Sequence, residues 1–597
     1  MRRRWAPLAL HAIAFALLLF WSWRKWPDPL VDFGRELYVP WQIGRGRVLY
    51  RDIASLFGPL SPYLNALWFR LFGPSLLTLA ICNLAIFSAM LAGLYHLLRA
   101  STDRVTATAA GLTTLLLFGF SQYVETGNYN FVTPYSHEAT HGMALSVALL
   151  ACLYRTLRTR SRIASATAGL CFGLVLLTKP EIGAAATAAV LAAGVAAYGL
   201  DGHVRRLLIP TASLFIIAAA IPPLLFLSYF ATQMDSAAAL RATAGAWVPL
   251  FATGITANDF YRGSMGLDAP AANTARMLAT FAGFIAFTAA AFAISWTSVD
   301  GTGRMSARTR ILRVALLALV ILVMRPGTFP RALPLIVIST LVAVVMLFVR
   351  TRSDRDRAVR LTPLIMCAVF ALVLLAKMGL NARVEHYGFY LGLPAMAVAI
   401  ALVSGIIPHL LTSWRSDTAG RTFRQLALWA LAAVIAPYLG LAYGWYRTKT
   451  LAVASGSDRF YASTLDGLWQ GRAVRDALGV LAQNAAPGDT LAVLPEGVML
   501  NYLARLDSPL RVINLMPPEV MAFGEDDVLR SLAARPPDFV LLVHRDTSEY
   551  GYPPFGRDPR YGLRIVNWIT ERYDGVRRIG PPGDADAGMQ LLKRRSR

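Results

Sequence analysis

Long apolar runs separated by short polar segments fill residues 1–445 of the 597-residue chain. A helix that crosses a membrane needs about 20 mostly apolar residues. About thirteen runs approach this length, and each is predicted to span the membrane: 6–26, 75–98, 105–121, 139–154, 163–179, 182–200, 207–231, 276–297, 311–326, 331–349, 361–379, 386–408 and 424–445. The pattern therefore predicts a polytopic α-helical membrane domain over residues 1–445.

The segments that join these runs alternate in charge. Every second one is rich in arginine: 99–104, 155–162, 205–206, 304–313, 350–360 and 415–424. Because basic loops face the cytoplasm, the N-terminus is predicted to be cytoplasmic, and an odd number of spans places residues 446–597 outside. The outer segments 27–74 and 232–275 are long, and each is expected to hold a short helix at the membrane surface.

After residue 445 the pattern changes to helical segments that alternate with short apolar strands. Predicted helices cover 466–485, 498–506 and 526–534, and predicted strands cover 490–495, 511–515 and 538–544. This alternation predicts a small extracytoplasmic α/β domain over residues 446–597.

Composition narrows the classes of partner. Hydrophobic residues make up 56% of the chain and charged residues only 16%, whereas soluble domains are about a quarter charged. The net charge of +23 comes largely from short arginine runs between apolar stretches, so we expect membrane lipid and no nucleic acid as partner. The cysteines lie in or beside apolar stretches without a CxxC pair, so no disulfide framework or thiolate metal site is predicted: Cys82, Cys152, Cys171 and Cys367.

Asp32 is the first ionisable candidate, because it follows the first predicted span directly. An ionisable group at bilayer depth costs about 2.5–3.5 kcal/mol on insertion scales, which makes such groups functional candidates. Asp32 could act as a base toward an acceptor hydroxyl. The alternative is a solvated loop carboxylate paired with Arg35.

A second polar cluster begins the fourth predicted span. If Glu138 starts that helix, His137 and His141 share one face at a spacing of four residues. With Glu138 they could be metal ligands or a proton relay. One histidine pair does not define a metal site, so no metal ligand is predicted and a divalent metal stays open.

Positive charge also collects at the outer ends of the spans, where it is normally scarce. The residues are Lys179, Arg325, Arg331, Arg383 and the adjacent His386. Internal ion pairs would explain them, Lys179 with Glu181 and Arg383 with Glu385. An anionic ligand such as a lipid-linked phosphate would explain them equally, because arginine presents a planar fork of donors to phosphate oxygens.

These residues resemble the GT-C-type glycosyltransferases that use polyprenyl-phosphate sugars, nearest to bacterial relatives of protein O-mannosyltransferases and of the transferases that add aminoarabinose to lipid A. The family's Asp-x-x-Arg after the first span resembles Asp32-Phe-Gly-Arg35, and its interfacial prolines and aromatics resemble residues 58–68. Glu138 matches the second acidic residue, and Thr178-Lys179 the Thr-Lys pair. The resemblance covers about residues 1–200. The lipid A transferases carry an acidic-basic pair where this chain has Phe57-Gly58.

The resemblance implies an inverting transfer of a sugar from a polyprenyl-phosphate donor to an acceptor hydroxyl at the outer face of a bacterial inner membrane. Asp32 would be the general base and Glu138 a second catalytic residue. Donor phosphate would be bound by Arg35, Lys179, Arg325, Arg331 and Arg383, and substrate by Glu36, Tyr38, His137, His141, His386 and Tyr387. The sugar and the acceptor (glycan, lipid or protein) stay open. The alternative is a transporter or lipid flippase, a class that places ionisable groups nearer the bilayer midplane.

Overall fold

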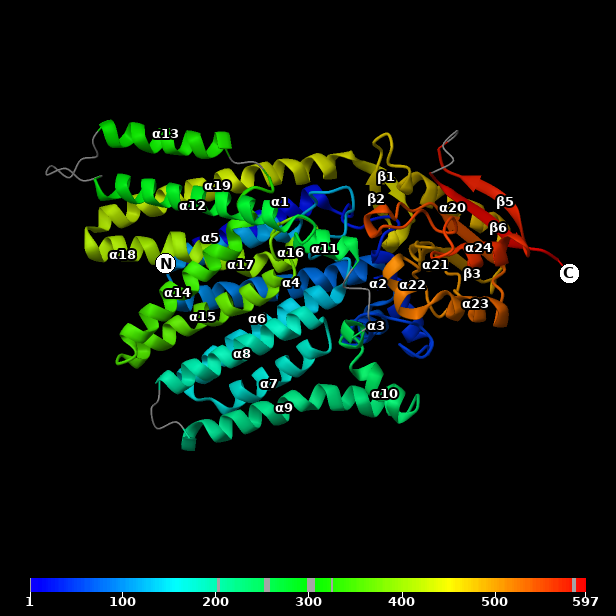
Figure 1. Ribbon diagram of the computed structural model, residues 1–597, viewed down its shortest axis with the longest axis horizontal. Coiled ribbons are helices and arrows are strands. Elements are labelled where there is room, and N and C mark those ends of the chain that lie inside the picture. The colour runs from blue at the N-terminus through cyan, green and yellow to red at the C-terminus, as the bar shows by residue number, and fades with distance from the viewer. Residues whose placement is uncertain are drawn as a thin grey trace.

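The computed structural model describes residues 2–200, 205–251, 258–297, 307–323, 326–581 and 587–596. A bundle of long helices forms one end of the molecule and a mixed helix and sheet region forms the other (Figure 1). The N-terminal end of the first helix lies at the end of the bundle that is remote from the sheet.

The bundle contains the following helices: α1 (Arg2–Ser22), α4 (Leu76–Ser101), α5 (Arg104–Thr113) with η1 (Thr114–Gly119), α6 (His137–Thr159), α7 (Arg162–Leu176), α8 (Pro180–Leu200), α9 (Arg205–Ala231), α12 (Pro270–Trp296), α13 (Ala307–Val323), α14 (Leu333–Thr351), α15 (Arg355–Ala376), α17 (Leu393–Ile400) with η4 (Ala401–Ile406) and α18 (Ile407–Trp414), and α19 (Asp417–Thr448). Each predicted span falls on one of these segments. The prediction of a polytopic helical membrane protein is confirmed.

Fewer helices than predicted are long and apolar enough to cross a membrane. Within the described residues nine segments meet both conditions, and Arg104–Gly119 and Arg162–Leu176 are shorter apolar helices. Two further predicted spans, on α6 and α13, are helical but fall outside that set. Both begin or end with several ionisable side chains, which lower their apolar character.

Small residues allow the bundle helices to approach closely. On α7, a methyl group added to Gly169 or Gly173 would collide with the backbone carbonyls of Phe215 and Ala219 on α9. The two glycines are four residues apart, which is the small-xxx-small spacing that brings membrane helices into backbone contact. Gly169 and Gly173 therefore allow the backbones of α7 and α9 to lie in contact.

Short helices fill the two long outer segments, as predicted. The first segment contains α2 (Phe33–Gly44) and α3 (Leu60–Phe72), and the second contains α10 (Ser236–Thr243), η2 (Val248–Phe251) and α11 (Asp259–Met265). Two further short helices precede bundle helices, η3 (Phe329–Ala332) and α16 (Gly388–Leu391). The candidate site lies among these elements.

The C-terminal region contains two sheets. The strands are β1 (Lys449–Val453), β2 (Phe460–Ser463), β3 (Leu491–Leu494), β4 (Phe539–Val543), β5 (Tyr573–Ile579) and β6 (Met589–Arg594). β1 and β2 pair antiparallel, and the second sheet has the order β3-β4-β6-β5 with only β3 and β4 parallel. The associated helices are η5 (Gly456–Asp458), α20 (Gln470–Asn484), α21 (Met499–Ala504), α22 (Pro517–Phe523), α23 (Glu525–Ala534), η6 (Ser548–Tyr550) and α24 (Leu563–Thr570).

The predicted strand at 511–515 is wrong, and its backbone groups explain why. The carbonyl of Arg511 accepts from the amide of Ala54 at 2.8 Å, and the amide of Leu515 donates to the carbonyl of Pro495 at 2.7 Å. Both partners lie in connecting segments of other parts of the chain. The segment therefore bonds at one end to the segment before α3 and at the other to the loop after β3, instead of joining a sheet ladder.

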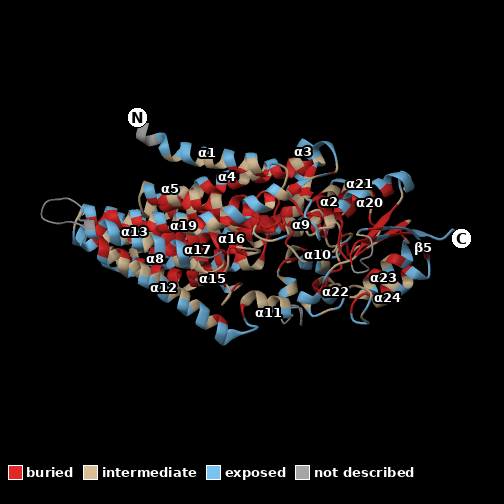
Figure 2. Ribbon diagram, turned by 90° about the horizontal axis from the view of Figure 1, so that it is seen from above, coloured by how far each residue is buried: buried red, intermediate tan, exposed pale blue. Residues whose placement is uncertain are grey.

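Helix α2 joins the two regions of the molecule. Leu30, Phe33 and Leu37 belong to the same buried cluster as Val498 and Met499 of the tail. Figure 2 shows buried residues that continue from the bundle through α2 toward α21. The start of α2 is thus held by hydrophobic packing from the C-terminal region as well as from the bundle.

Candidate functional site

Asp32 lies at the centre of a strained turn immediately before α2. The amide of Phe33 donates to the carbonyl of Val31 at 2.6 Å, and Asp32 has φ 55° and ψ −58°. This is the positive-φ form of the γ-turn, which is rare because it is strained. The side chain of Asn128 holds the turn, because it accepts from the amide of Asp28 at 2.8 Å and donates to the carbonyl of Val31 at 2.5 Å. Strain of this kind persists where surrounding contacts impose it.

The Asp32 carboxylate is left free by this turn. An aspartate before a helix usually accepts from the first helical amides, but Asp32 caps none of them. Its nearest ionic partner within the described chain is Arg35, at 3.8 Å from Nη1 to Oδ1. Burial raises the pKa of Asp32 to about 7, against the opposing effect of Arg35. A carboxylate with that pKa is suited to proton transfer at neutral pH.

Glu36 holds the neighbouring charges in place. Its Oε1 lies 3.1 Å from Arg35 Nη2, and its Oε2 lies 2.7 Å from His137 Nδ1 and accepts from the His137 amide at 3.0 Å. His137 Nε2 in turn lies 2.8 Å from the side-chain nitrogen of Asn83. Burial favours a high pKa for Glu36, but the hydrogen bond to His137 and the charge of Arg35 lower it to about 2. Glu36 is therefore an anion that positions Arg35 and His137.

The predicted polar cluster at the start of α6 is only partly assembled. His137 and His141 share a face, with ring centroids 5.5 Å apart. Glu138 accepts from Ser136 Oγ at 2.5 Å, and His141 Nδ1 lies 2.9 Å from Ser61 Oγ. His137 therefore contacts Glu36, and His141 contacts Ser61, instead of Glu138. In the described residues no group of three or more His, Cys, Asp or Glu side chains is arranged to hold a metal, and we derive no step through one.

Lys179 and Arg35 flank a single phenyl ring. Lys179 Nζ lies 4.7 Å from the ring centroid of Phe57, and Arg35 Cζ lies 4.4 Å from the same centroid. Lys179 also donates to the hydroxyl of Tyr135 at 2.6 Å. The ring supplies the negative face that attracts both cations.

Lys179 does not form the ion pair with Glu181 that was one of the two explanations for its charge. Glu181 forms an ion pair with Lys377 and accepts from the hydroxyl of Tyr390 at 2.8 Å. Lys179 therefore has no carboxylate within ion-pair distance in the described part of the chain. Burial lowers its pKa to about 8, with Glu181 opposing this through its charge. A buried cation without a carboxylate partner is suited to an anionic ligand.

Arg331 and Arg383 form a second group of cations. The predicted pair of Arg383 with Glu385 is absent from the described residues, and the closest side-chain partner of Arg383 is Ser264 Oγ, at 3.5 Å. Nη1 of Arg331 and Nε of Arg383 are buried without a hydrogen-bond partner. Burial lowers the pKa of Arg383, and the charge of Arg331 adds to this effect. Arg325, which the sequence also indicated, lies outside the described residues.

An aromatic wall connects the two groups of cations. The ring centroid of His386 lies 4.1 Å from that of Tyr129 and 4.0 Å from that of Tyr387, and the Tyr387 ring is 4.9 Å from Tyr135. Burial lowers the pKa of His386 to about 3, so this histidine is neutral. Tyr38 lies away from the wall, where its hydroxyl accepts from the amide of Ser508 at 2.7 Å. Of the predicted substrate-binding residues, His386 and Tyr387 thus face the cations and Tyr38 supports the tail.

Three residues of the tail lie at the site and were not predicted from the sequence: Glu496, Arg545 and Glu519. Glu496 accepts from the Asp32 amide at 3.1 Å, and its other oxygen lies 2.9 Å from Arg545 Nε. Burial raises the pKa of Glu519 to about 8, although Arg35 opposes this. Glu496 and Arg545 each follow the C-terminal end of a parallel strand, β3 or β4. Functional residues often lie at that edge in α/β sheets, and this position was the available signal.

Comparisons with known proteins give matches in structure alone. No protein-family model matches the chain, and no curated protein matches it in sequence. ArnT from Cupriavidus metallidurans, bound to undecaprenyl phosphate, is similar at 11% identity and a TM-score of 0.48, over 98% of this chain and 97% of that one. The apo oligosaccharyltransferase of Archaeoglobus fulgidus is similar at 16% identity and a TM-score of 0.48, over 91% and 70%. Both are GT-C glycosyltransferases, the class that the sequence motifs resemble.

Proposed function

We propose that the chain is a membrane glycosyltransferase that moves a sugar from a polyprenyl-phosphate donor to an acceptor hydroxyl, with inversion. The observation that carries the proposal is the Asp32 carboxylate. It is half-buried, caps no helix amide and lies 3.8 Å from Arg35, whose guanidinium shares the ring of Phe57 with Lys179. A stable fold gains nothing from such an arrangement, because uncompensated buried charge is costly.

Asp32 acts as the general base in this reaction. Its carboxylate accepts the proton of the acceptor hydroxyl while that oxygen forms a bond to the anomeric carbon. The bond from the anomeric carbon to the donor phosphate breaks, and its electron pair leaves with the polyprenyl phosphate. Attack opposite the leaving group inverts the configuration. The pKa of about 7 leaves a large fraction of Asp32 ionised at neutral pH.

Lys179, Arg331 and Arg383 stabilise the charge that grows on the departing phosphate. Lys179 offers an ammonium group without a carboxylate partner, and the two arginines offer buried N–H groups without acceptors. Electrostatic stabilisation of this kind typically contributes several kcal/mol in a water-poor site. Arg35 is already engaged by Glu36 and the carbonyl of Tyr135, so it positions the carboxylates and contributes charge from a distance.

The acceptor approaches from the side of the C-terminal region. Glu519 has a pKa of about 8 because it is buried, so at neutral pH it is largely protonated and can donate a hydrogen bond to an acceptor oxygen. Glu138 contributes a second buried carboxyl near Arg35. We assign residues 1–445 to the membrane domain and residues 446–597 to the soluble domain. In this proposal the reaction takes place on the periplasmic side of a bacterial inner membrane.

A panel of radiolabelled polyprenyl-phosphate sugars tests this function. Membranes that contain the chain are incubated with each donor, and the label is followed into lipid, glycan and protein fractions. We expect at least one donor to lose label to an acceptor, with release of polyprenyl phosphate, in these membranes and not in membranes that lack the chain. Passage of an intact donor across the bilayer without transfer would instead identify a transporter or flippase.

A further inference from the structure

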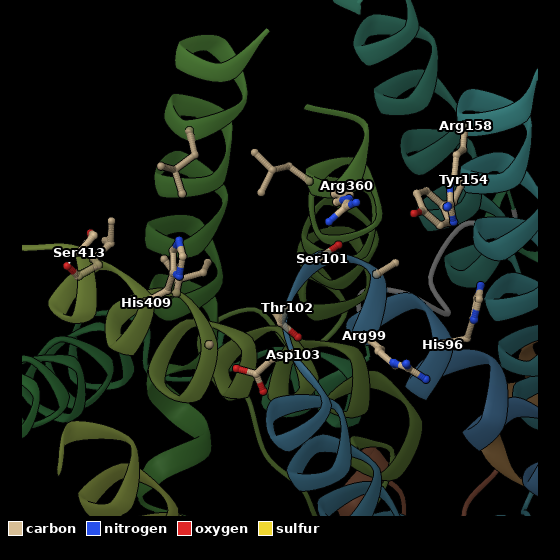
Figure 3. Close-up of a pocket in the computed structure, with 16 residues that line it drawn as sticks. His96, Arg99, Ser101, Thr102, Asp103, Tyr154, Arg158, Arg360, His409 and Ser413 are labelled. Carbon is tan, nitrogen blue, oxygen red and sulfur yellow. Dashed lines mark hydrogen bonds between the residues drawn. The ribbon is translucent and has the colours of Figure 1, made fainter. Parts of the chain in front are cut away.

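A cavity of about 610 Å³ opens between α4, α6 and α15 (Figure 3). These helices have the cavity at their ends remote from the C-terminal region, as their course in Figure 1 shows. It lies where α4 and α6 end and where α15 begins. None of its lining residues belongs to the site around Asp32. The cavity therefore needs an explanation of its own.

Cationic side chains from three helices surround this cavity. Arg99 comes from the last turn of α4, Arg158 from the last turn of α6, and Arg360 from the first turns of α15 (Figure 3). His96 and His409 line the same space. Within the described residues these five side chains form no ion pair and no hydrogen bond to the protein.

Three other arginines at this end of the bundle find partners in the protein. Arg424 lies 2.6 Å from Asp103, the one acidic residue of the cavity lining. Arg355 donates to the carbonyl of Leu157 at 2.8 Å, and Arg313 donates to the side chain of Gln425 at 2.7 Å. The positive-inside bias accounts for the number of arginines here. It does not by itself explain why three of them without a partner in the described residues line one cavity.

The walls of the cavity are suited to a phosphate that is attached to a lipid. Ser101 Oγ is buried without a hydrogen-bond partner, and the buried Tyr154 lines the same space. Apolar side chains complete the lining: Leu347, Leu361, Ile406 and Leu410. A free anion needs only the polar part of such a site, whereas a lipid also covers the apolar part. The ends of the spanning helices lie at the depth where lipid headgroups lie.

We propose that this cavity binds the phosphate group of an anionic membrane phospholipid. The guanidinium groups of Arg99, Arg158 and Arg360 bind the phosphate oxygens, with Ser101 and Tyr154 as additional hydrogen-bonding groups. The apolar residues contact the glycerol and the first carbons of the acyl chains. Basic pockets between membrane helices recognise anionic headgroups by this chemistry. The inference is independent of the transferase reaction.

Lipid titration of the full-length chain in detergent tests the proposal. Binding of phosphatidylglycerol, phosphatidylcholine and inorganic phosphate is measured by native mass spectrometry for the wild type and two triple variants. The first variant carries Arg99→Gln, Arg158→Gln and Arg360→Gln. The matched control carries Arg308→Gln, Arg310→Gln and Arg352→Gln, which remove the same charge at the same end of the bundle but do not line the cavity.

We expect the apparent Kd for phosphatidylglycerol to rise about 100-fold in the first variant, since each basic group contributes about fivefold. The control should change it by less than about threefold. Binding of inorganic phosphate without phosphatidylglycerol, lost in the first variant alone, would assign the same anion chemistry to a free phosphate. Equal losses in both triple variants, or equal binding of phosphatidylcholine and phosphatidylglycerol, would overturn the proposal. If the triple variant does not fold, the exposed Arg360→Gln is compared with Arg352→Gln, and a rise of about fivefold is expected.

Discussion

The two ends of the helical bundle both collect positive charge, but they hold it differently. At the end next to the sheet, Lys179 and Arg35 both lie against the ring of Phe57, and Arg35 pairs with Glu36. At the remote end, Arg99 and Arg360 are exposed and face a cavity without a paired carboxylate. Burial shifts the pKa of groups at the first end toward neutrality. The first end therefore has the features that the proposed proton transfer needs, and the second has those that the proposed attraction of an anion needs.

Removal of the Asp32 carboxylate should produce the largest effect. Asp32→Asn keeps the size of the side chain but cannot accept a proton, so the transfer rate should fall by at least about 1,000-fold. Donor binding should stay within about threefold, because the cations are unchanged. Transfer and donor binding are measured separately on purified protein.

Asp52→Asn is the matched control for this substitution. Asp52 lies in the same outer segment, but it is partly exposed and pairs with Arg51 at 2.8 Å. A surface pair of this kind contributes at most about 1 kcal/mol, so transfer should stay near the wild-type rate. An Asp32→Asn protein with full activity would remove the base from the mechanism, whatever the donor proves to be.

Loss of the Lys179 charge should produce the next largest effect. Lys179→Gln should lower the transfer rate by about 100-fold, since single groups that stabilise transition-state charge contribute 100- to 1,000-fold. Lys179→Arg keeps the charge and should retain much of the activity. The two variants separate a need for charge from a need for a side chain of this length.

Lys179→Arg also tests which group sets the pH dependence of the transfer rate. The wild-type rate should rise with pH through about 7, as Asp32 loses its proton, and fall above about 8, as Lys179 loses its charge. Arginine stays protonated at these pH values. Lys179→Arg should therefore keep the rise of the rate near pH 7 (the acid limb) and move the fall of the rate above pH 8 (the alkaline limb) to higher pH. An alkaline limb at an unchanged pH would assign that limb to another group.

Glu496 tests whether the tail positions Asp32. Glu496→Gln weakens the ion pair with Arg545 and the support of the Asp32 amide, and we expect a rate loss of about 10-fold. The negative charge of Glu496 also raises the pKa of Asp32. Its removal should therefore shift the acid limb to lower pH, which a purely structural role would not do. Asp574→Asn, at an exposed pair with Arg595 in the same region, should change neither value.

The sequence predicted the bundle well because its signal is physical and local. Apolar length locates α4, α8 and α14, and the alternation of arginine-rich loops follows from the cost of moving charge across a bilayer. The same rules say nothing about the order β3-β4-β6-β5 or about the position of Arg511 against Ala54. Those depend on pairing between residues that are far apart in sequence.

The site was predictable only where a residue's position on one element sufficed. Asp32 was indicated by its place after the first span, and Lys179 by its charge at an outer end. The residues that contact the site from elsewhere in the chain were not predictable in this way. Glu181 lies two residues from Lys179 but pairs with Lys377, 196 residues away. Glu496 follows a tail strand and bonds to Asp32 across 464 residues. The first contact requires the packing of α8 against α15, and the second requires the packing of the start of α2 against the tail.

Phe57 should produce the smallest effect, because it acts on the cations without touching the reacting atoms. Phe57→Leu keeps an apolar side chain but removes the ring face from Lys179 and Arg35. Cation–π contacts contribute about 0.5–2 kcal/mol, so the transfer rate should fall about 3- to 10-fold. The ring stabilises the charged form of Lys179, so its loss should also move the alkaline limb to lower pH. This is opposite in direction to the change expected for Lys179→Arg.

Phe57→Tyr is the control, because it retains a ring face above both cations and should keep the alkaline limb in place. A rate loss in Phe57→Leu with an unchanged alkaline limb would mean that the ring only fills space. A loss together with the shift would mean that the uncharged ring sustains the charge of Lys179. The Gly58 amide donates to the carbonyl of Thr178 at 3.1 Å. This bond joins the residue after Phe57 to the residue before Lys179, so the backbone holds the ring beside the ammonium group. A substitution of Phe57 should therefore change the ring without moving Lys179.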